Sequence, residues 1–305
     1  MTNPSICLPT SGLPGELASA TTCAPFRITE FTRSAGAHEE CLPPAEPGRM
    51  KLVTWNVNSL KTRLPRLLEL LAVHRPDVVC LQETKCTTEA FPHVELAEAG
   101  YTAADHSGGR WAGVAILGRS DAPPTDVVRG LTGETASDEC RWIEATVAGI
   151  RTCSVYVANG RAVGSESFAQ KLAFLDAMAA RVTQLAGAVT IIAGDCNVAP
   201  ADIDVYDPQA FIGSTHVTPE ERGRLGAILD AGLVDAYRQL HPDEVGFTWW
   251  DYRAGHFHKK LGLRIDLVLC TPDLTAQLTG CGIDRSFRKG AKPSDHAPLL
   301  AELAG

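Results

Sequence analysis

The sequence lacks an apolar run of membrane-spanning length and an excess of basic residues. No stretch approaches the roughly 18 consecutive apolar residues that cross a bilayer, so we expect no membrane span and no membrane partner. The 305 residues carry 28 Lys and Arg against 36 Asp and Glu, which gives a formal net charge of −8. This balance excludes a strongly basic protein that coats nucleic acid. It leaves open a nucleic-acid enzyme, which needs only a local basic surface.

The sequence also lacks the cysteine spacing of a zinc site or of a dense disulfide framework. None of its ten cysteines forms a C-x-x-C pair. Cys80, Cys153 and Cys270 lie in apolar, strand-like runs, where a buried thiol acts as a small hydrophobic side chain. We therefore expect a reducing, cytoplasmic compartment. A G-x-S-x-G elbow is absent as well, which disfavours acyl transfer by a serine hydrolase.

Residues 1–49 differ in composition from the rest of the chain. They contain no lysine and are rich in Pro, Ser, Thr, Ala and Gly, so we expect a poorly ordered extension. Three prolines interrupt the first 14 residues and no basic stretch precedes an apolar run there, so we expect no signal peptide. A second hypothesis is that Met50 is the biological start, because strand-like patterning begins at Lys51.

Residues 50–305 alternate strand and helix patterns and are predicted to form one domain. Leucines at helical spacing predict a first helix, with Pro65 in its first turn. Ser165 and the capping box 218–221 begin two further helices, and Ala148-Gly149 predicts a hairpin. The clear apolar strands are 51–56, 78–81, 114–117, 141–147, 150–157, 190–193 and, as the last, 265–270. The presence of hairpins favours an α/β fold with mixed, mostly antiparallel sheets stacked between helices.

Polar residues repeatedly follow the apolar strands, where α/β scaffolds place functional groups. Asn56 and Asn58 come after the first strand and would share one side of an extended chain, although turn-forming asparagine explains them equally well. Glu83 follows the second strand; its carboxylate is either simply solvated or a ligand for a hard cation such as Mg²⁺. Asp195 and Asn197 follow a later strand and could hold a water molecule, or form only an Asx-turn.

Two further motifs lie in the C-terminal third. Asp295-His296 is weak evidence alone, but Asp266 could fix the imidazole by a hydrogen bond, as a carboxylate does in a triad. The aromatic run 247–252 is either core or the wall of a pocket for a sugar or a base.

Seven motifs in this order resemble the exonuclease III family of abasic-site endonucleases, within the endonuclease/exonuclease/phosphatase superfamily. The resemblance runs from about Met50 to the C-terminus. The matching blocks are W-N-V-N, Q-E-T-K, V-Y-V-A-N-G, G-D-C-N, F-T-W-W-D, R-I-D-L and S-D-H-A-P. The resemblance implies a four-layered α/β sandwich, in agreement with the strand pattern. It also implies Mg²⁺-dependent hydrolysis of DNA 5′ to abasic sites, with 3′–5′ exonuclease and 3′-end-trimming activity; Mn²⁺ is expected to substitute.

The resemblance also assigns catalytic roles. Asp195 would activate or orient the attacking water and Asn197 would hold it in line. His296 would donate to a phosphate oxygen, with its tautomer fixed by Asp266. Tyr156 would contact the phosphate or the leaving group. Whether Asp195 acts as base or as leaving-group acid stays open, as does the number of metal ions.

Metal and substrate residues follow in the same way. Glu83 would bind the metal, with Asn56, Asn58 and Asp295 beside it. Some relatives carry Asp at the position of Asn58 and tend to be stronger nicking enzymes, so the balance between nicking and 3′ trimming stays open. The remaining predicted residues bind substrate: Trp249, Leu263 and Ile265 as a small apolar pocket for a base-less deoxyribose, and Lys85, Arg161 and Arg253 on the DNA.

The charge of one segment supports a polyanionic substrate. Residues 251–292 hold eight Lys or Arg against four Asp, inside a chain that is acidic overall. We therefore expect double-stranded DNA with abasic sites or blocked 3′ ends as the partner, a monomer, and a bacterial, nucleoid-associated cytoplasmic protein. Two alternatives remain at this point: a superfamily phosphoesterase acting on a phosphoinositide, a sphingolipid or RNA, and a DNA-binding protein without catalysis.

Overall fold

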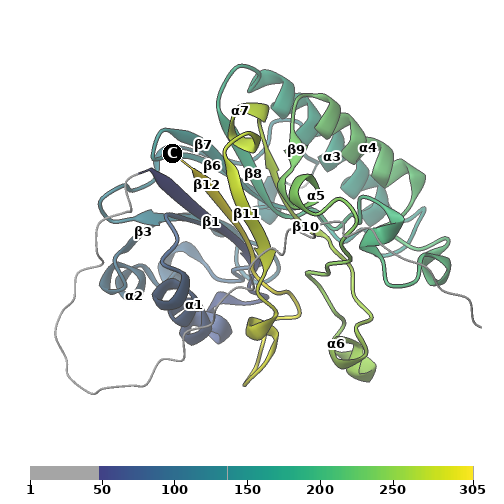
Figure 1. Ribbon diagram of the computed structural model, residues 1–305, viewed down its shortest axis with the longest axis horizontal. Helices are drawn as coiled ribbons and strands as arrows, with labels where there is room; N and C mark the ends of the chain where they lie inside the picture. The colour runs from purple at the N-terminus through teal and green to yellow at the C-terminus, as the bar shows by residue number, and fades with distance from the viewer. Residues whose placement is uncertain (1–47, 136, 305) are drawn as a thin grey trace, which may run out of the picture. The chain divides into compact units, whose positions relative to one another are not determined.

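Two six-stranded sheets pack face to face in the computed structural model, which describes residues 48–135 and 137–304 (Figure 1). Most of the predicted extension, residues 1–49, lies outside this range; Gly48 and Arg49 are described, and Arg49 is already the first residue of β1. In spatial order the first sheet contains β11 (Leu278–Ile283), β12 (Leu299–Ala304), β1 (Arg49–Asn56), β2 (Val78–Gln82), β4 (Val114–Arg119) and β3 (Tyr101–His106). The second contains β5 (Thr125–Arg129), β6 (Trp142–Val147), β7 (Ile150–Tyr156), β8 (Thr190–Asp195), β10 (Asp266–Cys270) and β9 (Val234–Asp235).

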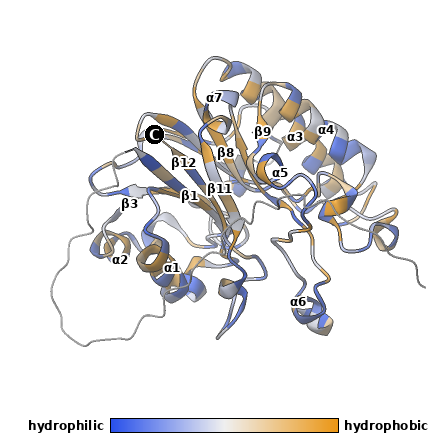
Figure 2. Ribbon diagram, viewed as in Figure 1, coloured by the Kyte–Doolittle hydropathy of each residue, from blue (hydrophilic) through white to orange (hydrophobic). Residues whose placement is uncertain are grey.

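Helices cover the outer faces of both sheets, so the predicted four-layered sandwich is confirmed. Leucines of α1 pack with Val53 and Leu81 on the first sheet, while Phe174 and Met178 of α3 pack on the second. The inner faces of the sheets share one apolar core, which is why the central strands carry mostly hydrophobic colours in Figure 2. The helices are α1 (Leu60–His74), α2 (His93–Glu98), α3 (Glu166–Gln184), α4 (Pro219–Asp230), α5 (Ala236–Leu240), α6 (His256–Lys259) and α7 (Pro272–Thr275).

The local start signals were correct for two helices and wrong for one. Ser165 caps α3 by accepting a hydrogen bond from the Phe168 backbone N–H at 3.2 Å, and Thr218 and Glu221 form the predicted capping box of α4. Pro65, however, lies inside α1 rather than in its first turn, because the helix begins at Leu60. Loop carbonyls explain this earlier start: the N–H groups of Ser59 and Leu60 donate to the carbonyls of Glu83 and Thr84.

The strand register brings the sequence motifs to one edge of the sandwich. Each sheet contains one parallel pair, β1–β2 and β7–β8, and these pairs end at Asn56 and Gln82 and at Tyr156 and Asp195. β10 begins at the same place, where Asp266 is paired with Asp195. We call this set of strand ends the shared edge.

Two strands follow the segment that we expected to be the last. β11 and β12 pair with each other, and β12 also pairs with β1. β11 has the sequence LTGCGI, whose glycines and half-exposed positions hide the strand pattern. The predicted hairpin at Ala148-Gly149 is confirmed, since Val147 faces Ile150 across β6 and β7. Among the described residues, no helix has both the length and the apolar character needed to span a bilayer.

Candidate active site

Glu83 and Lys85 lie on the loop that follows β2, and both have left-handed backbone conformations, with φ of 53° and 50°. Such strain in non-glycine residues is typical of functional sites. The ammonium of Lys85 lies 2.6 Å from Glu83 Oε2 and donates to Asn58 Oδ1 at 2.6 Å. The predicted metal ligand and the predicted substrate-binding lysine therefore form one ion pair at the shared edge.

Asn56 joins the two sheets at this edge. Its Nδ2 donates to Glu83 Oε1 at 2.8 Å and to Asp195 Oδ2 at 2.9 Å. Its Oδ1 accepts from the backbone N–H of Asn58 at 3.0 Å. The side chain is fully buried, so this orientation is fixed by its partners on three sides. In this orientation, Asn56 directs its amide nitrogen toward the carboxylates of Glu83 and Asp195. It therefore holds these two groups in place and does not present its amide oxygen between them as a metal ligand.

Asn58 and Asp295 lie beside this group and contact each other. Asn58 Nδ2 donates to Asp295 Oδ1 at 2.9 Å, and the indole N–H of Trp249 donates to Asp295 Oδ2 at 3.1 Å. Burial raises the pKa of Asp295, but His296 and these two donors outweigh it and hold the pKa below its usual value. Asp295 is therefore a half-buried carboxylate that links the Trp249 segment to the loop after β1.

Asp195 and Asn197 share one hydrogen-bonded turn after β8. The Asn197 backbone N–H donates to Asp195 Oδ1 at 2.9 Å, and its Nδ2 donates to the carbonyl of Val157 at 2.8 Å. Gly194 is required here, because a Cβ on it would lie 2.0 Å from the carbonyl oxygen of Val155 on the neighbouring strand. Burial raises the pKa of Asp195 to about 7, although His296 acts in the opposite direction. A carboxyl group of this kind can accept or release a proton near neutral pH.

His296 faces both Asp266 and Asp195. Its Nδ1 lies 2.8 Å from Asp266 Oδ2, and its Nε2 lies 3.7 Å from Asp195 Oδ2. Burial lowers the pKa of His296, but the two carboxylates outweigh it and raise the value to about 10. The backbone is held from both sides: Thr248 Oγ1 accepts from the Asp266 N–H at 3.1 Å, and Ser294 Oγ accepts from the His296 N–H at 3.2 Å. A protonated imidazole is thus positioned at the shared edge.

The donor set of this site fits a divalent cation. Glu83 and Asp195 each offer a carboxylate oxygen, and these atoms and a ring nitrogen of His296 lie within 4.8 Å of one another. Carboxylate oxygens are the ligands that Mg²⁺ and similar hard cations prefer. Four acidic groups converge here (Glu83, Asp195, Asp266 and Asp295), and Lys85 and His296 are the cations that face them. An added cation would balance this excess of negative charge.

The three residues predicted as an apolar pocket belong to one small cluster next to Asp266. Leu263 and Ile265 are buried, and Trp249 is half-buried and packs against them together with Phe211 and Val217. Trp249 also pairs through its backbone with both Leu263 and His296. The cluster therefore borders the histidine directly. Arg264, which lies between the two buried aliphatic residues, is held in the interior by Asp204 and Asp235.

The remaining predicted residues differ in how they are placed. Tyr156 is buried at the end of β7, with the guanidinium of Arg141 4.6 Å from the centre of its ring, and burial raises its pKa well above the usual value. Arg161 is exposed on the loop after β7. Arg253 is 88% exposed and pairs with Asp251. These two arginines are available to solvent but contact none of the catalytic side chains in the described hydrogen bonds.

One group of residues was missed by the sequence analysis. Lys171 of α3 is fully buried; its ammonium pairs with Glu221 of α4 and donates to the Asn197 carbonyl at 2.7 Å and to the Asn159 carbonyl at 3.3 Å. His216 also binds the Asn197 carbonyl, through Nδ1 at 2.6 Å. The capping box identified Glu221 as a helix start only. A lysine on the apolar face of α3 is the one signal that could have revealed this network.

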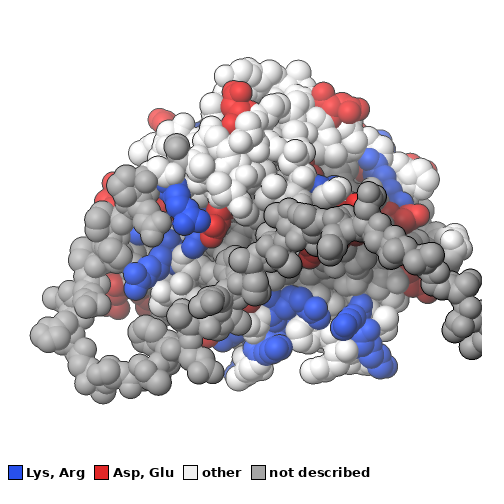
Figure 3. Space-filling model, in the orientation of Figure 1, with Lys and Arg blue, Asp and Glu red and all other residues white. Residues whose placement is uncertain are grey.

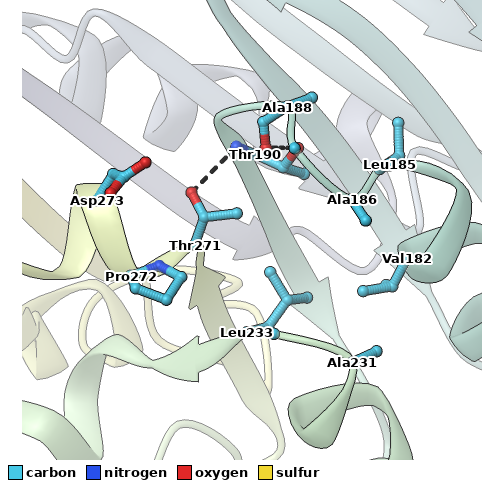
Figure 4. A pocket seen from close by; sticks show the side chains of 12 residues that line it. Val182, Leu185, Ala186, Ala188, Thr190, Ala231, Leu233, Thr271, Pro272 and Asp273 are labelled. Carbon is cyan, nitrogen blue, oxygen red and sulfur yellow. Dashed lines mark hydrogen bonds between the residues drawn. The ribbon is translucent and has the colours of Figure 1, made fainter.

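The basic surface and the pocket lie in different places on the molecule. Lys and Arg gather on the side of the molecule where α6 lies (Figure 3). A pocket of about 210 Å³ lies elsewhere, between the first residue of β8 and the residues after β10. Figure 4 shows Thr190 and Thr271 side by side in its lining, joined by a hydrogen bond from the Thr190 N–H to Thr271 Oγ1 at 3.3 Å. Because the shared edge is at the other end of these strands, the pocket has no part in the site.

Comparisons with known proteins agree with this geometry. The sequence pattern of the Endonuclease/Exonuclease/phosphatase family matches residues 53–296. Exodeoxyribonuclease III of Haemophilus influenzae is 32% identical over 273 residues, which cover 83% of this chain and 100% of that protein. A 3′ phosphatase from Neisseria, bound to a product DNA hairpin, superposes with a TM-score of 0.82 at 39% identity, covering 84% of this chain and 100% of that one.

An AP endonuclease from Archaeoglobus fulgidus is also similar, with a TM-score of 0.80 at 34% identity over 83% of this chain and 98% of that one. The family is metal-dependent, in keeping with the carboxylate and histidine group at the shared edge. The chain therefore belongs to the endonuclease/exonuclease/phosphatase family and, within it, to the exodeoxyribonuclease III group of hydrolytic DNA repair nucleases.

Proposed function

We propose that the protein is a Mg²⁺-dependent DNA repair nuclease that cuts the phosphodiester 5′ to abasic sites and trims nucleotides and blocking groups from 3′ ends. One observation carries the proposal: the side-chain amide of Asn56 donates hydrogen bonds both to Glu83 of one sheet and to Asp195 of the other, beside His296. The protein would act as a monomer on double-stranded DNA in the bacterial cytoplasm.

Asp195 and Asn197 form the water-handling part of the mechanism. Asp195 is buried and has a pKa of about 7, so at neutral pH it can take a proton from water or give one to the leaving oxygen. The side chain of Asn197 is fixed by the Val157 carbonyl and by Asp195, so it can direct a water molecule without itself moving. Positioning of this kind lowers the entropic cost of attack.

His296 would donate a hydrogen bond to a non-bridging phosphate oxygen. Asp266 binds Nδ1, which leaves Nε2 as the free donor on the side of Asp195. With a pKa of about 10, the imidazole is protonated at neutral pH and carries positive charge where the phosphate gains negative charge. Tyr156, buried at the end of β7, would contact the phosphate or the leaving group from the other side.

Glu83 would hold the metal ion, with the carboxylate of Asp195 within reach of the same position. Bound Mg²⁺ would supply charge neutralisation for the phosphate. As arranged here, Asn58 and Asp295 would support this position from behind, since they bond to each other and to Lys85 and Trp249. Trp249, Leu263 and Ile265 would receive the base-less sugar, while Lys85, Arg161 and Arg253 would contact the DNA backbone.

The test uses three labelled duplexes: one with an internal abasic-site analogue, one with a 3′-phosphate and one intact. We expect a single cut 5′ to the lesion and removal of the 3′-phosphate in Mg²⁺, and neither in EDTA. Asp121→Asn, a change at a surface carboxylate that is 59% exposed, serves as a matched control for Asp195→Asn. Removal of the 3′-phosphate without a cut at the abasic site would restrict the activity to 3′ ends. Binding without any cleavage would overturn the proposal in favour of a non-catalytic DNA-binding protein, and absence of binding would favour a different phosphoester.

A further inference from the structure

Arg288 is a buried cation that the proposed mechanism does not use. It ends the short turn Arg285–Arg288 between β11 and β12 and is 6% exposed. Taking a guanidinium out of water is unfavourable, and a carboxylate partner usually offsets this penalty. In the described part of the chain, however, its hydrogen bonds go to two carbonyls: Nη1 donates to that of Ser294 at 2.6 Å and Nη2 to that of Trp250 at 3.3 Å. A cation enclosed in this way indicates a role beyond the stability of the fold.

Ser294 connects Arg288 to the shared edge. Its carbonyl accepts from the guanidinium, while its hydroxyl donates to the Asn56 carbonyl at 2.7 Å and accepts from the His296 N–H at 3.2 Å. The serine is fully buried, so its conformation is fixed by these partners. One guanidinium therefore holds, through a single serine, the asparagine that joins the two sheets and the histidine that faces Asp195.

Aromatic rings of residues 250–262, which we call the α6 loop, cover the guanidinium of Arg288. The guanidinium carbon lies 5.0 Å from the centre of the Phe257 ring and 5.4 Å from that of the Tyr252 ring. Phe257 belongs to α6 itself, and the Trp250 ring packs edge-on against it with 5.1 Å between the ring centres. Cation–π contacts are strongest when the cation is shielded from water, as this one is. Figure 1 shows α6 extending away from both sheets, so the rings join a projecting loop to the interior.

We propose that Arg288 is a positioning residue that couples the α6 loop to the alignment of Asn56 and His296. This inference rests on the proposed nuclease function, because the α6 loop carries Arg253, which is proposed to contact DNA. The rings fix the guanidinium, the guanidinium fixes Ser294, and the serine fixes the two residues of the active site. Because its donors are occupied by carbonyls inside the protein, Arg288 acts on the rate of cleavage and adds no affinity for DNA.

The experiment measures single-turnover cleavage of an abasic duplex in Mg²⁺, and binding of the same duplex in EDTA, for the wild type, Arg288→Met and Arg288→Lys. Methionine removes both donors, so we expect the cleavage rate to fall about tenfold with Kd within about twofold of the wild type. Lysine can still donate to the Ser294 carbonyl and should restore part of the rate. Arg151→Met is the matched control, because Arg151 donates to the Asp126 carbonyl at 2.7 Å near the start of β7, at the opposite end of that strand from the site.

A double-mutant cycle tests the connection to the α6 loop. Phe257→Ala removes one ring from the guanidinium and should lower the cleavage rate about threefold in the wild-type background. In the Arg288→Met background the same change should lower the rate no further, because the group on which the ring acts is gone. Independent, multiplicative losses of rate would overturn the coupling between the loop and the site.

Thermal unfolding of each variant gives the folded fraction to which its cleavage rate is normalised. Unchanged rates in both Arg288 variants would overturn the inference while leaving the nuclease function intact. An equal loss of rate in Arg151→Met would also overturn it, because the effect would then reflect stability alone. If Arg288→Met does not fold, unchanged rates in Arg288→Lys and Phe257→Ala would have the same meaning. A wild type that neither binds nor cuts DNA would instead contradict the proposed function itself.

Discussion

The two sheets contribute unlike halves to the same site. On the first sheet, Glu83 is 14% exposed and its charge is balanced by Lys85, a cation whose side chain is itself 23% exposed. On the second sheet, Asp195 is 1% exposed and is held by the amides of Asn56 and Asn197. An accessible carboxylate with an exchangeable cation is suited to metal binding, and a buried one with a raised pKa is suited to moving a proton. The difference teaches that one functional group, the carboxylate, is suited to two different tasks when its surroundings differ.

Asp195→Asn would break the proton-handling half and is expected to have the largest effect. The amide keeps the shape of the side chain but cannot accept a proton, so kcat should fall by roughly three to four orders of magnitude while DNA binding persists. Single-turnover cleavage and a binding titration in EDTA check this. Cleavage within tenfold of the wild type would show that Asp195 neither activates water nor serves the leaving group.

Asp266→Asn would test how the same half keeps His296 protonated. Since Asp266 raises the pKa of His296 toward about 10, protonated imidazole is present below that pH and is lost as the pH rises through it. Removing the carboxylate lowers this pKa, so we expect kcat to fall by roughly 10²–10³ and the alkaline limb of its pH profile to move to lower pH. Asp284→Asn is the matched control. Asp284 forms an ion pair with His74, with 2.9 Å between the two side chains, and this pair lies outside the site. An unmoved alkaline limb in Asp266→Asn would contradict this role.

Glu83→Gln would sharpen the metal-binding half. The neutral amide is a weaker ligand, so the Mg²⁺ concentration for half-maximal activity should rise about tenfold to a hundredfold, with part of the activity restored at high Mg²⁺. Titrations of activity with Mg²⁺ and with Mn²⁺ measure it. Glu69→Gln, at a carboxylate that is 50% exposed, should leave the metal titration unchanged. An unchanged titration for Glu83→Gln would move the metal away from this side chain.

Among these variants, Lys171→Arg is expected to have the smallest effect on activity. Lys171→Met is expected to reduce the stability of the fold more than Lys171→Arg does. The methionine leaves Glu221 buried without its ion pair, which costs about 3–5 kcal/mol of unfolding free energy. The arginine keeps the charge but displaces the bond to the Asn197 carbonyl, so we expect kcat to fall by about tenfold with KM unchanged.

The control for Lys171 is on the same helix. Arg181→Met removes a partner of buried Glu144 without touching the Asn197 loop, so it should lower Tm and leave kcat of the folded enzyme unchanged. Parallel losses of kcat in both helix variants would mean that Lys171 acts only through stability. Chemical denaturation and cleavage assays on the same samples compare the two.

The elements that could be predicted from sequence were those with a local signal. The capping residues Ser165 and Thr218 gave two helix starts, and the alternating apolar strands gave the layered fold. β11 could not be found, because its glycines give no pattern and its pairing with β12 is a tertiary contact. Likewise, the start of α1 depends on carbonyls of a distant loop rather than on its own cap.

The candidate site was predictable as a set of residues and, for Asp266 and His296, as a hydrogen bond, but its other hydrogen bonds were not predictable. Asp195, Asn197, Asp266 and His296 were chosen from their motifs, and the structure places them together. The bridging role of Asn56 arises only when two strands from different sheets meet, and no sequence spacing encodes that meeting. Lys171 was overlooked for the same reason, since its partners come from three separate segments.

The pairing of β1 with β12 has a consequence for the folding of the chain during its synthesis on the ribosome. β12 lies between β1 and β11, and His296 lies three residues before its first residue, so the first sheet stays incomplete until residues 299–304 are available. A nascent chain that has already exposed Glu83 and Asp195 still lacks its imidazole and the strand that seats it. A chain that ends before residue 296 would therefore lack both the candidate catalytic histidine and the strand that joins β1 to β11.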